Sequence, residues 1–337
     1  MYIQDQVSYD QLDDEHLSFF RAIGVDSIHL ELRGGAPAAG RKGGTGSANT
    51  TLAQDLRAGR DCTDELAQAR EKVEAHGMRL NNIFMPAWEE ITLAEADMDE
   101  KIGYWCQMLA CVGRAGISCV GWNFKPMGNF RTTSDVGRGG VQYSTFDYAE
   151  FDKNRPTAHE PPVAEAQMWE RMERFLQAVV PAAEQAGVVI ALHPDDPPVP
   201  EPLAGVAQIC STLEQFRKTF FELAPSDNNR MLFCQGCMTE LLGPEGIYGA
   251  IAEMASQGKI AWVHFRNVRG QLPRFTEVFM DEGEVDMKRA MEVYRDNGFE
   301  GPYIMDHTPS FAQGFGPLHG KAYAIGYIRA LIQMVYG

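Results

Sequence analysis

The sequence predicts an α/β protein, a single (β/α)8 barrel, on three observations. Short runs of β-branched and aromatic residues alternate with longer segments of helical periodicity, which is typical of βαβ units around a parallel sheet. Eight such runs follow one another along the chain. A glycine separates a helix end from the next strand in EAHGMRL, GRAGISCV and EQAGVVIAL, which favours a (β/α)8 TIM barrel. A doubly wound sheet is the alternative.

The eight expected strands are short runs that are read most clearly from their C-terminal ends. They are YIQ near Tyr2 and the runs 25–32, 78–85, 117–124, 187–193, 230–234, 260–265 and 302–306. The clearest helix between them is Thr63–His76, for which Thr63 is a candidate N-cap and Gly77 a stop signal.

Two segments, near 33–60 and 135–162, interrupt this rhythm, and each follows an expected strand. We therefore expect insertions on the face where barrel active sites lie. The first is rich in Gly, Ala and Ser, which favours a surface loop over a lid, because composition reports flexibility and not gating. No internal repeat or linker divides the chain, so residues 1–337 are expected to form one domain.

Composition favours a small-molecule partner. The formal net charge of -16 would repel a nucleic-acid backbone or an anionic membrane surface. Seven cysteines at irregular spacing argue against a secreted disulfide framework and for a reducing compartment. The N-terminal residues lack a signal-peptide pattern and no apolar stretch is long enough to span a membrane, so we expect a cytoplasmic protein.

Four residues with metal-binding side chains lie at the ends of expected strands, namely His193, Cys234, His264 and Asp306. In a parallel barrel these ends converge on one mouth. Two imidazoles, a thiolate and a carboxylate suit manganese, iron or zinc better than calcium. A single histidine at a strand end is more often a buried polar residue, so the predicted metal centre depends on all four together.

The stretch HPDDPP, residues 193–198, places two carboxylates on a turn that prolines hold extended and stiff. Asp195 or Asp196 could act as a general acid or base, or orient the hydroxyls of a substrate. The alternative is that they cap the following helix, which we expect for one of the two.

Neighbouring residues offer further functions. Arg266 and Asn267 follow His264, and a guanidinium there could clamp a carboxylate. Lys125 and Arg131 are further cationic candidates, with surface ion pairs as the alternative for each cation. CQGC, residues 234–237, could be a redox pair, but such pairs usually begin a helix, whereas this one follows a buried strand.

Several blocks resemble the D-mannonate dehydratase family, metal-dependent enzymes related in fold to the xylose-isomerase-like barrels. The blocks are HPDDPP at 193–198, LFCQG at 232–236, VHFRNV at 263–268, GEVDM at 283–287, MDH at 305–307 and NFKP at 123–126, followed by RTT. HPDDPP is the specific one. The resemblance implies a Mn2+ site, or one for Fe2+, Co2+ or Zn2+, formed by His193, Cys234, His264 and Asp306. It also implies removal of water from a sugar acid, which leaves a 2-keto-3-deoxy product.

Three positions depart from the family pattern. Met280 and Trp88 stand where the family usually has histidine, and His319 stands where it tends to have tyrosine. These departures concern proton transfer and not the metal ligands, so a metal- or sugar-binding barrel without catalysis remains an alternative.

The leading hypothesis is a metal-dependent lyase that acts on a sugar acid, in which the metal stabilises enediolate charge. Asp195 or Asp196 and His307 or His319 are the candidates for proton transfer. The candidates for substrate binding are Arg266, Asn267, Lys125 and Asn123. A sugar isomerase or epimerase on the same scaffold is the alternative. A homo-oligomer, either a dimer or a tetramer, is expected.

Overall fold

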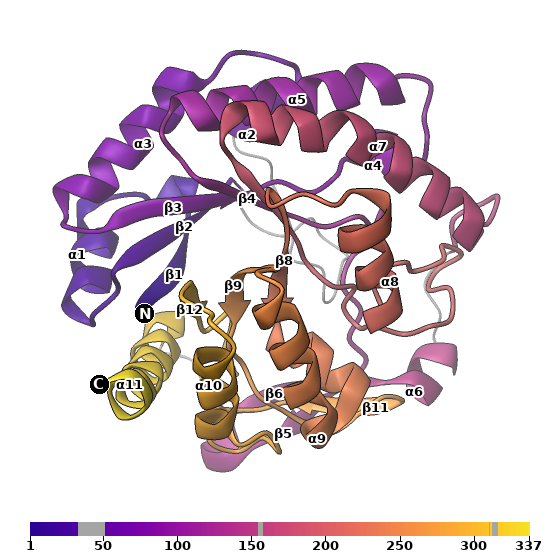
Figure 1. Cartoon of the computed structure of the whole chain (residues 1–337). Coiled ribbons are helices and arrows are strands. Elements are labelled where there is room, and N and C mark those ends of the chain that lie inside the picture. The colour runs from indigo at the N-terminus through magenta and orange to yellow at the C-terminus, as the bar shows by residue number, and fades with distance from the viewer. Residues whose placement is uncertain (33–50, 154–157, 310, 312–315) are drawn as a thin grey trace.

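The structure, a computed structural model, describes residues 1–32, 51–153, 158–309, 311 and 316–337. Within these residues eight parallel strands close into a barrel, in which β12 returns to pair with β1 (Figure 1). They are β1 (Tyr2–Ser8), β2 (Ser27–Glu31), β3 (Arg79–Phe84), β4 (Cys119–Trp122), β7 (Val189–Leu192), β8 (Asn229–Cys234), β9 (Ile260–His264) and β12 (Pro302–Ile304). Each overlaps one of the expected strands, so the predicted TIM barrel is confirmed.

The inside of the barrel is filled by side chains. Trp262 of β9 reaches across to β4, where a Cβ built on Gly121 would lie 2.8 Å from the indole ring. Only glycine leaves room for the ring there. Cys119, Ala191 and Leu232 join Trp262 in this buried cluster, which makes the barrel a packed core and not a channel.

Helices surround the barrel (Figure 1). The longer ones are α1 (Asp14–Ala22), α3 (Thr63–Ala75), α5 (Met98–Arg114), α7 (Glu165–Ala186), α9 (Gln235–Ser256), α10 (Met287–Asp296) and α11 (Gly316–Tyr336). Shorter helical segments are Tyr9–Gln11, α2 (Thr51–Arg57), α4 (Glu89–Thr92), Arg138–Gly140, α6 (Tyr148–Lys153), α8 (Leu213–Arg217) and Lys218–Leu223. Phe175 of α7 packs 5.2 Å, between ring centroids, from both Trp105 of α5 and Trp122 of β4. The main core therefore lies between the strands and the helices.

The predicted helix start at residue 63 is confirmed, but the predicted N-cap is wrong. Helix α3 begins with Thr63 as its first helical residue, and Cys62 is the N-cap without a side-chain hydrogen bond. The Thr63 amide donates to Asp61 Oδ1 at 3.0 Å. The carboxylate of Asp61 thus satisfies one of the free amides of the first helical turn.

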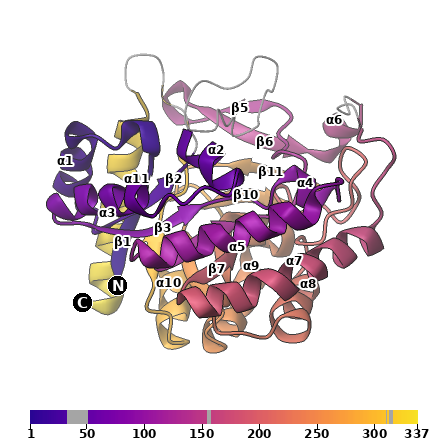
Figure 2. The same cartoon turned by 90° about the horizontal axis from the view of Figure 1, so that it is seen from above.

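The segment expected as an insertion near 135–162 contains two strands and a helix in its described part. Strands β5 (Ser134–Val136) and β6 (Gln142–Asp147) pair with β10 (Val268–Gln271) and β11 (Arg274–Glu277) in a four-stranded sheet that lies apart from the barrel strands (Figure 2). We call it the outer sheet. The sequence analysis missed β10 and β11 because they are short and polar and flank Leu272–Pro273.

The other expected insertion, near 33–60, also contains a helix, since α2 spans Thr51–Arg57 with one buried side. Its residues 33–50 lie outside the described part of the chain. Among the described residues, no helix combines the length and the apolar character needed to cross a membrane.

Candidate metal centre and active site

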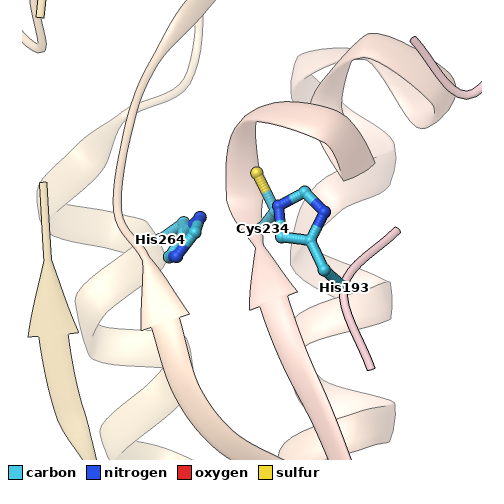
Figure 3. A group of neighbouring side chains, drawn as sticks. All are labelled: His193, Cys234 and His264. Carbon is cyan, nitrogen blue, oxygen red and sulfur yellow. The ribbon is translucent and has the colours of Figure 1, made fainter. Parts of the chain in front are cut away.

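Three of the four predicted metal ligands converge at the C-terminal ends of neighbouring barrel strands. His193 directly follows β7, and Cys234 and His264 are the last residues of β8 and β9. One ligand atom from each lies within 4.8 Å of the other two. Figure 3 shows both imidazoles next to the sulfur, at the point where β8 turns into α9. The three residues are brought together because parallel strands end at one rim.

The hydrogen bonds of these side chains leave ligand atoms for a metal. Nδ1 of His193 lies 2.7 Å from the carbonyl oxygen of Pro194 and donates to it, which leaves Nε2 as the ring nitrogen for the metal. Nδ1 of His264 is buried and forms no hydrogen bond of good geometry among the described atoms, although Asp306 Oδ2 lies 3.3 Å away. Two imidazoles and a thiolate are a ligand set for a divalent transition metal.

Cys234 is held as a thiolate. Burial opposes this, but hydrogen bonds from Cys237, the charge of Arg266 and hydrogen bonds with His193 and His264 together lower the Cys234 pKa well below its ordinary value. The Cys237 amide donates to Cys234 Sγ at 3.5 Å, which makes Cys234 the N-cap of α9. The helix dipole adds to the same effect.

This geometry corrects the argument against a redox pair. CQGC does follow a buried strand, as expected, but it also begins a 22-residue helix. The position therefore does not separate a redox pair from a metal ligand. What favours the metal is the placement of His193 and His264 against Cys234.

The fourth predicted ligand lies beside the other three. Asp306 Oδ2 is 3.3 Å from His264 Nδ1 and 3.1 Å from Arg266 Nε. Its backbone has a φ of 66°, rare for a residue with a side chain, and Gln6 Nε2 donates to its carbonyl at 3.0 Å. Burial opposes ionisation, but His264 and His307 hold the pKa of the Asp306 carboxyl below its usual range. Asp306 is thus an ionised carboxylate at the edge of the metal group.

A cavity of about 730 Å³ lies between this group and the outer sheet. The barrel side is lined by His193, Asp196, Arg266, Asn267, Asp306 and His307, and the outer-sheet side by Ser134, Gln142, Ser144 and Glu277. The volume is in the range of small-molecule sites. The metal group and several titratable side chains therefore lie at the same cavity.

The two adjacent aspartates have different environments. Asp195 Oδ2 accepts from the Cys210 amide at 2.8 Å and from Ser211 Oγ at 3.1 Å, so it braces the turn before α8. Asp196 lines the large cavity and pairs with Arg131 Nη2 at 2.8 Å. Neither aspartate caps α8, because Thr212 is its N-cap; Asp195 holds the preceding turn, and Asp196 faces the site.

Arg266 and Asn267 line the cavity, but their polar atoms are already engaged. Arg266 donates to Asp306, to Glu240 at 2.9 Å and to Cys237 Sγ at 3.3 Å. Asn267 Nδ2 donates to the carbonyls of Met280 and Val285, and its Oδ1 accepts two amides. Arg266 therefore holds acidic side chains in place, and Asn267 anchors a loop.

The remaining predicted residues are more dispersed. His307 is half-exposed in the cavity lining, with Nε2 3.4 Å from Asp306 Oδ2 and 3.6 Å from Glu277 Oε1. Lys125 lines a separate small cavity beside Asp195, and its Nζ donates to Asn129 at 2.5 Å.

Two further candidates lie apart from the lining that the described residues form. The Asn123 carbonyl accepts from the Ala87 amide, and His319 is exposed on α11. The departures Met280 and Trp88 are both buried in the hydrophobic core.

Sequence reasoning missed two buried acidic residues. Glu277, at the end of β11, accepts from Arg131 Nη2 at 2.5 Å and lies 3.2 Å from Arg266 Nη1. Glu240 of α9 is fully buried and pairs with Arg266. Arg131 bridges Glu277 to Asp196 and so ties the outer sheet to the barrel mouth. A Glu in an otherwise apolar helix stretch was the one available signal for Glu240.

Comparison with known proteins identifies the family. Residues 157–336, more than half of the chain, match the model of D-mannonate dehydratase (UxuA). The chain belongs to the D-mannonate dehydratase family. Mannonate dehydratase from Streptococcus equi subsp. zooepidemicus is 27% identical over 306 residues, which cover 80% of this chain and 82% of that protein.

Solved structures show the same fold. The crystal structure of mannonate dehydratase from Streptococcus suis serotype 2 has a TM-score of 0.80 and 22% identity, and the match covers 99% of this chain and 93% of that one. A xylose isomerase-like TIM barrel protein from Mycobacterium smegmatis, in complex with magnesium, has a TM-score of 0.62 and 11% identity. This match covers 100% of this chain and 98% of that one. This member of the D-mannonate dehydratase family is thus a xylose-isomerase-like barrel.

Proposed function

We propose that this chain is a metal-dependent dehydratase that removes water from a sugar acid and leaves a 2-keto-3-deoxy acid. The observation that carries the proposal is the convergence of His193, Cys234 and His264 beside a cavity lined with acidic and basic side chains, in a member of the D-mannonate dehydratase family. Family membership favours this reaction over the isomerase or epimerase alternative. The names of the relatives make mannonate the first substrate to test.

In this proposal His193, Cys234, His264 and Asp306 hold the metal, with manganese as the first candidate. The bound ion supplies positive charge where negative charge develops beside the substrate carboxylate. Arg131 and Arg266 keep the surrounding carboxylates in fixed positions, so little reorganisation is needed during the reaction.

The protein's own groups move the protons. His307, in the cavity lining, takes the proton from the carbon next to the carboxylate. Asp196 gives a proton to the hydroxyl on the following carbon, the C–O bond breaks, and water leaves. The resulting enol then becomes the 2-keto acid. Both groups line the cavity, which argues for an active enzyme rather than a binding-only barrel despite the buried Met280.

The test combines metal analysis with a mass-resolved screen of aldonic acids. Wild-type protein should carry about one transition metal per chain and convert at least one aldonic acid to a product lighter by one water. Cys234→Ala should lose most of its metal, whereas Cys106→Ala, which changes a cysteine of α5 that donates to the Ala178 carbonyl, should keep it. A product of unchanged mass would instead indicate an isomerase, and equal metal loss in both variants would contradict the proposed ligand set.

A further inference from the structure

The Glu240 side chain is fully buried next to the cavity lining, and one of its oxygens lacks a partner. Its Oε1 accepts from Arg266 Nη1 at 2.9 Å, but Oε2 has no hydrogen bond among the described atoms. Asp196 Oδ1 is also without one, although Arg131 Nη2 lies 2.8 Å away. One oxygen of each carboxyl and the sulfur of Cys237 lie within 4.8 Å of one another. Two buried carboxyls with unsatisfied oxygens are therefore neighbours.

The charges around Glu240 do not balance if every carboxyl is ionised. The described groups that face it are the carboxyls of Asp196 and Glu277, the guanidiniums of Arg131 and Arg266, and the thiol of Cys237. Arg266 also pairs with Asp306, whose charge His264 offsets, so the remaining three carboxyls share two guanidiniums and leave one negative charge in excess. An unpaired buried charge is costly, so one carboxyl is expected to hold a proton.

Glu240 is the carboxyl best placed to hold it. Asp196 and Glu277 both contact Arg131, and Glu277 also lies near Arg266, whereas Glu240 has one guanidinium contact. Burial raises the Glu240 pKa to about 8; Arg266 and Arg131 oppose the shift, and Asp196 and Glu277 add to it. The ion-pair contacts and the direction of the pKa shift both indicate that Glu240 holds the proton.

The same three residues have metal-ligand atoms, but a cation does not suit them. Arg131 contacts Asp196, and Arg266 contacts both Cys237 and Glu240. A divalent ion among them would face two fixed positive charges at close range. A proton removes the excess negative charge without this repulsion.

We propose that Glu240 stores the proton that Asp196 delivers to the leaving hydroxyl of the substrate. The proton on the Glu240 carboxyl passes to Asp196 and from there to the hydroxyl oxygen, the C–O bond breaks, and water leaves. The proton that His307 takes from carbon reaches solvent, and solvent returns one to Glu240 after release of the product. This inference rests on the proposed function. Glu240 acts through Asp196 and is in that sense a positioning residue.

The kinetic test replaces Glu240 with glutamine, which keeps its size and one acceptor but cannot release the stored proton. In Glu240→Gln, kcat at neutral pH should fall about 10- to 100-fold with KM within about twofold. The alkaline limb of the kcat profile should also move to lower pH, because the proton that Glu240 holds in the wild type is absent. Glu245→Gln on the same helix, where the carboxylate is exposed and pairs with Arg289, is the matched control and should behave as wild type.

An infrared measurement tests the stored proton without substrate. Wild-type protein at pH 7 should show the carbonyl stretch of a protonated carboxylic acid that shifts on 13C-labelling of glutamate. Glu240→Gln should lose this band and Glu245→Gln should keep it. Absence of the band from wild type, or an unchanged kcat profile in Glu240→Gln, would overturn the proposed role of Glu240. Neither result would contradict the proposed dehydratase function. The band without any dehydration would overturn the proposed function and, with it, the delivery step.

Discussion

Cys234 shows how one residue combines a structural and a chemical role. It ends β8, caps α9, and presents its sulfur to two imidazoles. The same sulfur accepts the cap hydrogen bond and faces the two imidazoles. The N-terminus of α9 therefore stabilises the negative charge that a metal would bind. The position of the helix is therefore part of the electrostatics of the metal centre.

His264 should couple metal binding to pH. Burial disfavours its charged form, but Asp306 and the Cys234 thiolate outweigh burial and raise the His264 pKa to about 10 in the metal-free protein. A metal needs the neutral imidazole, so binding releases one proton and affinity should rise about tenfold per pH unit between pH 6 and 9. Competition with a chromophoric chelator at several pH values measures this slope. A flat dependence would contradict it, and His159→Gln, which changes a half-buried histidine outside the metal group, should leave the slope unchanged.

The same shift predicts the stability of the metal-free protein. The folded pKa of His264 lies above the value of about 6.5 expected in the unfolded chain. The folded state therefore binds the extra proton between these two values. Stability from this group is complete below pH 6.5 and is lost as the pH rises towards 10. Urea unfolding of chelator-treated protein across this range should show the decline.

At the scale of elements, a few charged contacts and a small apolar cluster hold the outer sheet against the barrel mouth. Arg131 lies after β4, Glu277 ends β11, and Asp196 follows β7, so a single guanidinium joins three segments. The ring of Phe275 packs against the same guanidinium, with the ring centroid 5.2 Å from Cζ of Arg131. These contacts turn an insertion into one wall of the cavity.

Replacing Arg131 with methionine should be strongly destabilising. The change leaves two buried carboxylates without their shared cation, for which a cost of about 3–5 kcal/mol in unfolding free energy is expected. Arg138→Met is the comparison, because Arg138 belongs to the same segment but pairs with Asp281 at the surface and should cost about 1 kcal/mol or less. Urea unfolding of the metal-free proteins measures both. Similar losses in the two variants would show that the buried bridge has no special role.

The elements also show what the sequence could predict. All eight barrel strands could be predicted, because a short apolar run is a local signal, and in three of them a glycine joint precedes the run. The predicted ligands follow from the same logic, since His193, Cys234 and His264 end such runs. Strands β10 and β11 could not, because they are short and mostly polar, and the sheet that their hairpin joins continues through β6, more than a hundred residues away. Glu240 and Glu277 could not be predicted for a similar reason, because the charged side chains around them come from other elements.

For the whole molecule, closure of the barrel joins the two ends of the chain. Strand β1 pairs with β12, and α11 packs beside β1 (Figure 1). Lys321 of α11 donates to the fully buried Asp5 of β1 at 2.7 Å. This ion pair links the first strand to the last helix across the length of the sequence.

Removing one partner of this ion pair should lower the free energy of unfolding more than removing both partners. Burial raises the Asp5 pKa, and Lys321 opposes that rise. In Lys321→Met only the Gln6 amide, which donates to Asp5 Oδ1 at 2.7 Å, still opposes the effect of burial, so unfolding free energy should fall by about 3–5 kcal/mol. The loss should grow from pH 5 to pH 8, because the unfolded chain gives up the Asp5 proton that the folded variant retains. Asp5→Asn combined with Lys321→Met leaves no charge to bury and should recover most of the loss. Equal losses in the single and double variants, measured by urea unfolding, would show that the Lys321 side chain acts through packing and not through its charge.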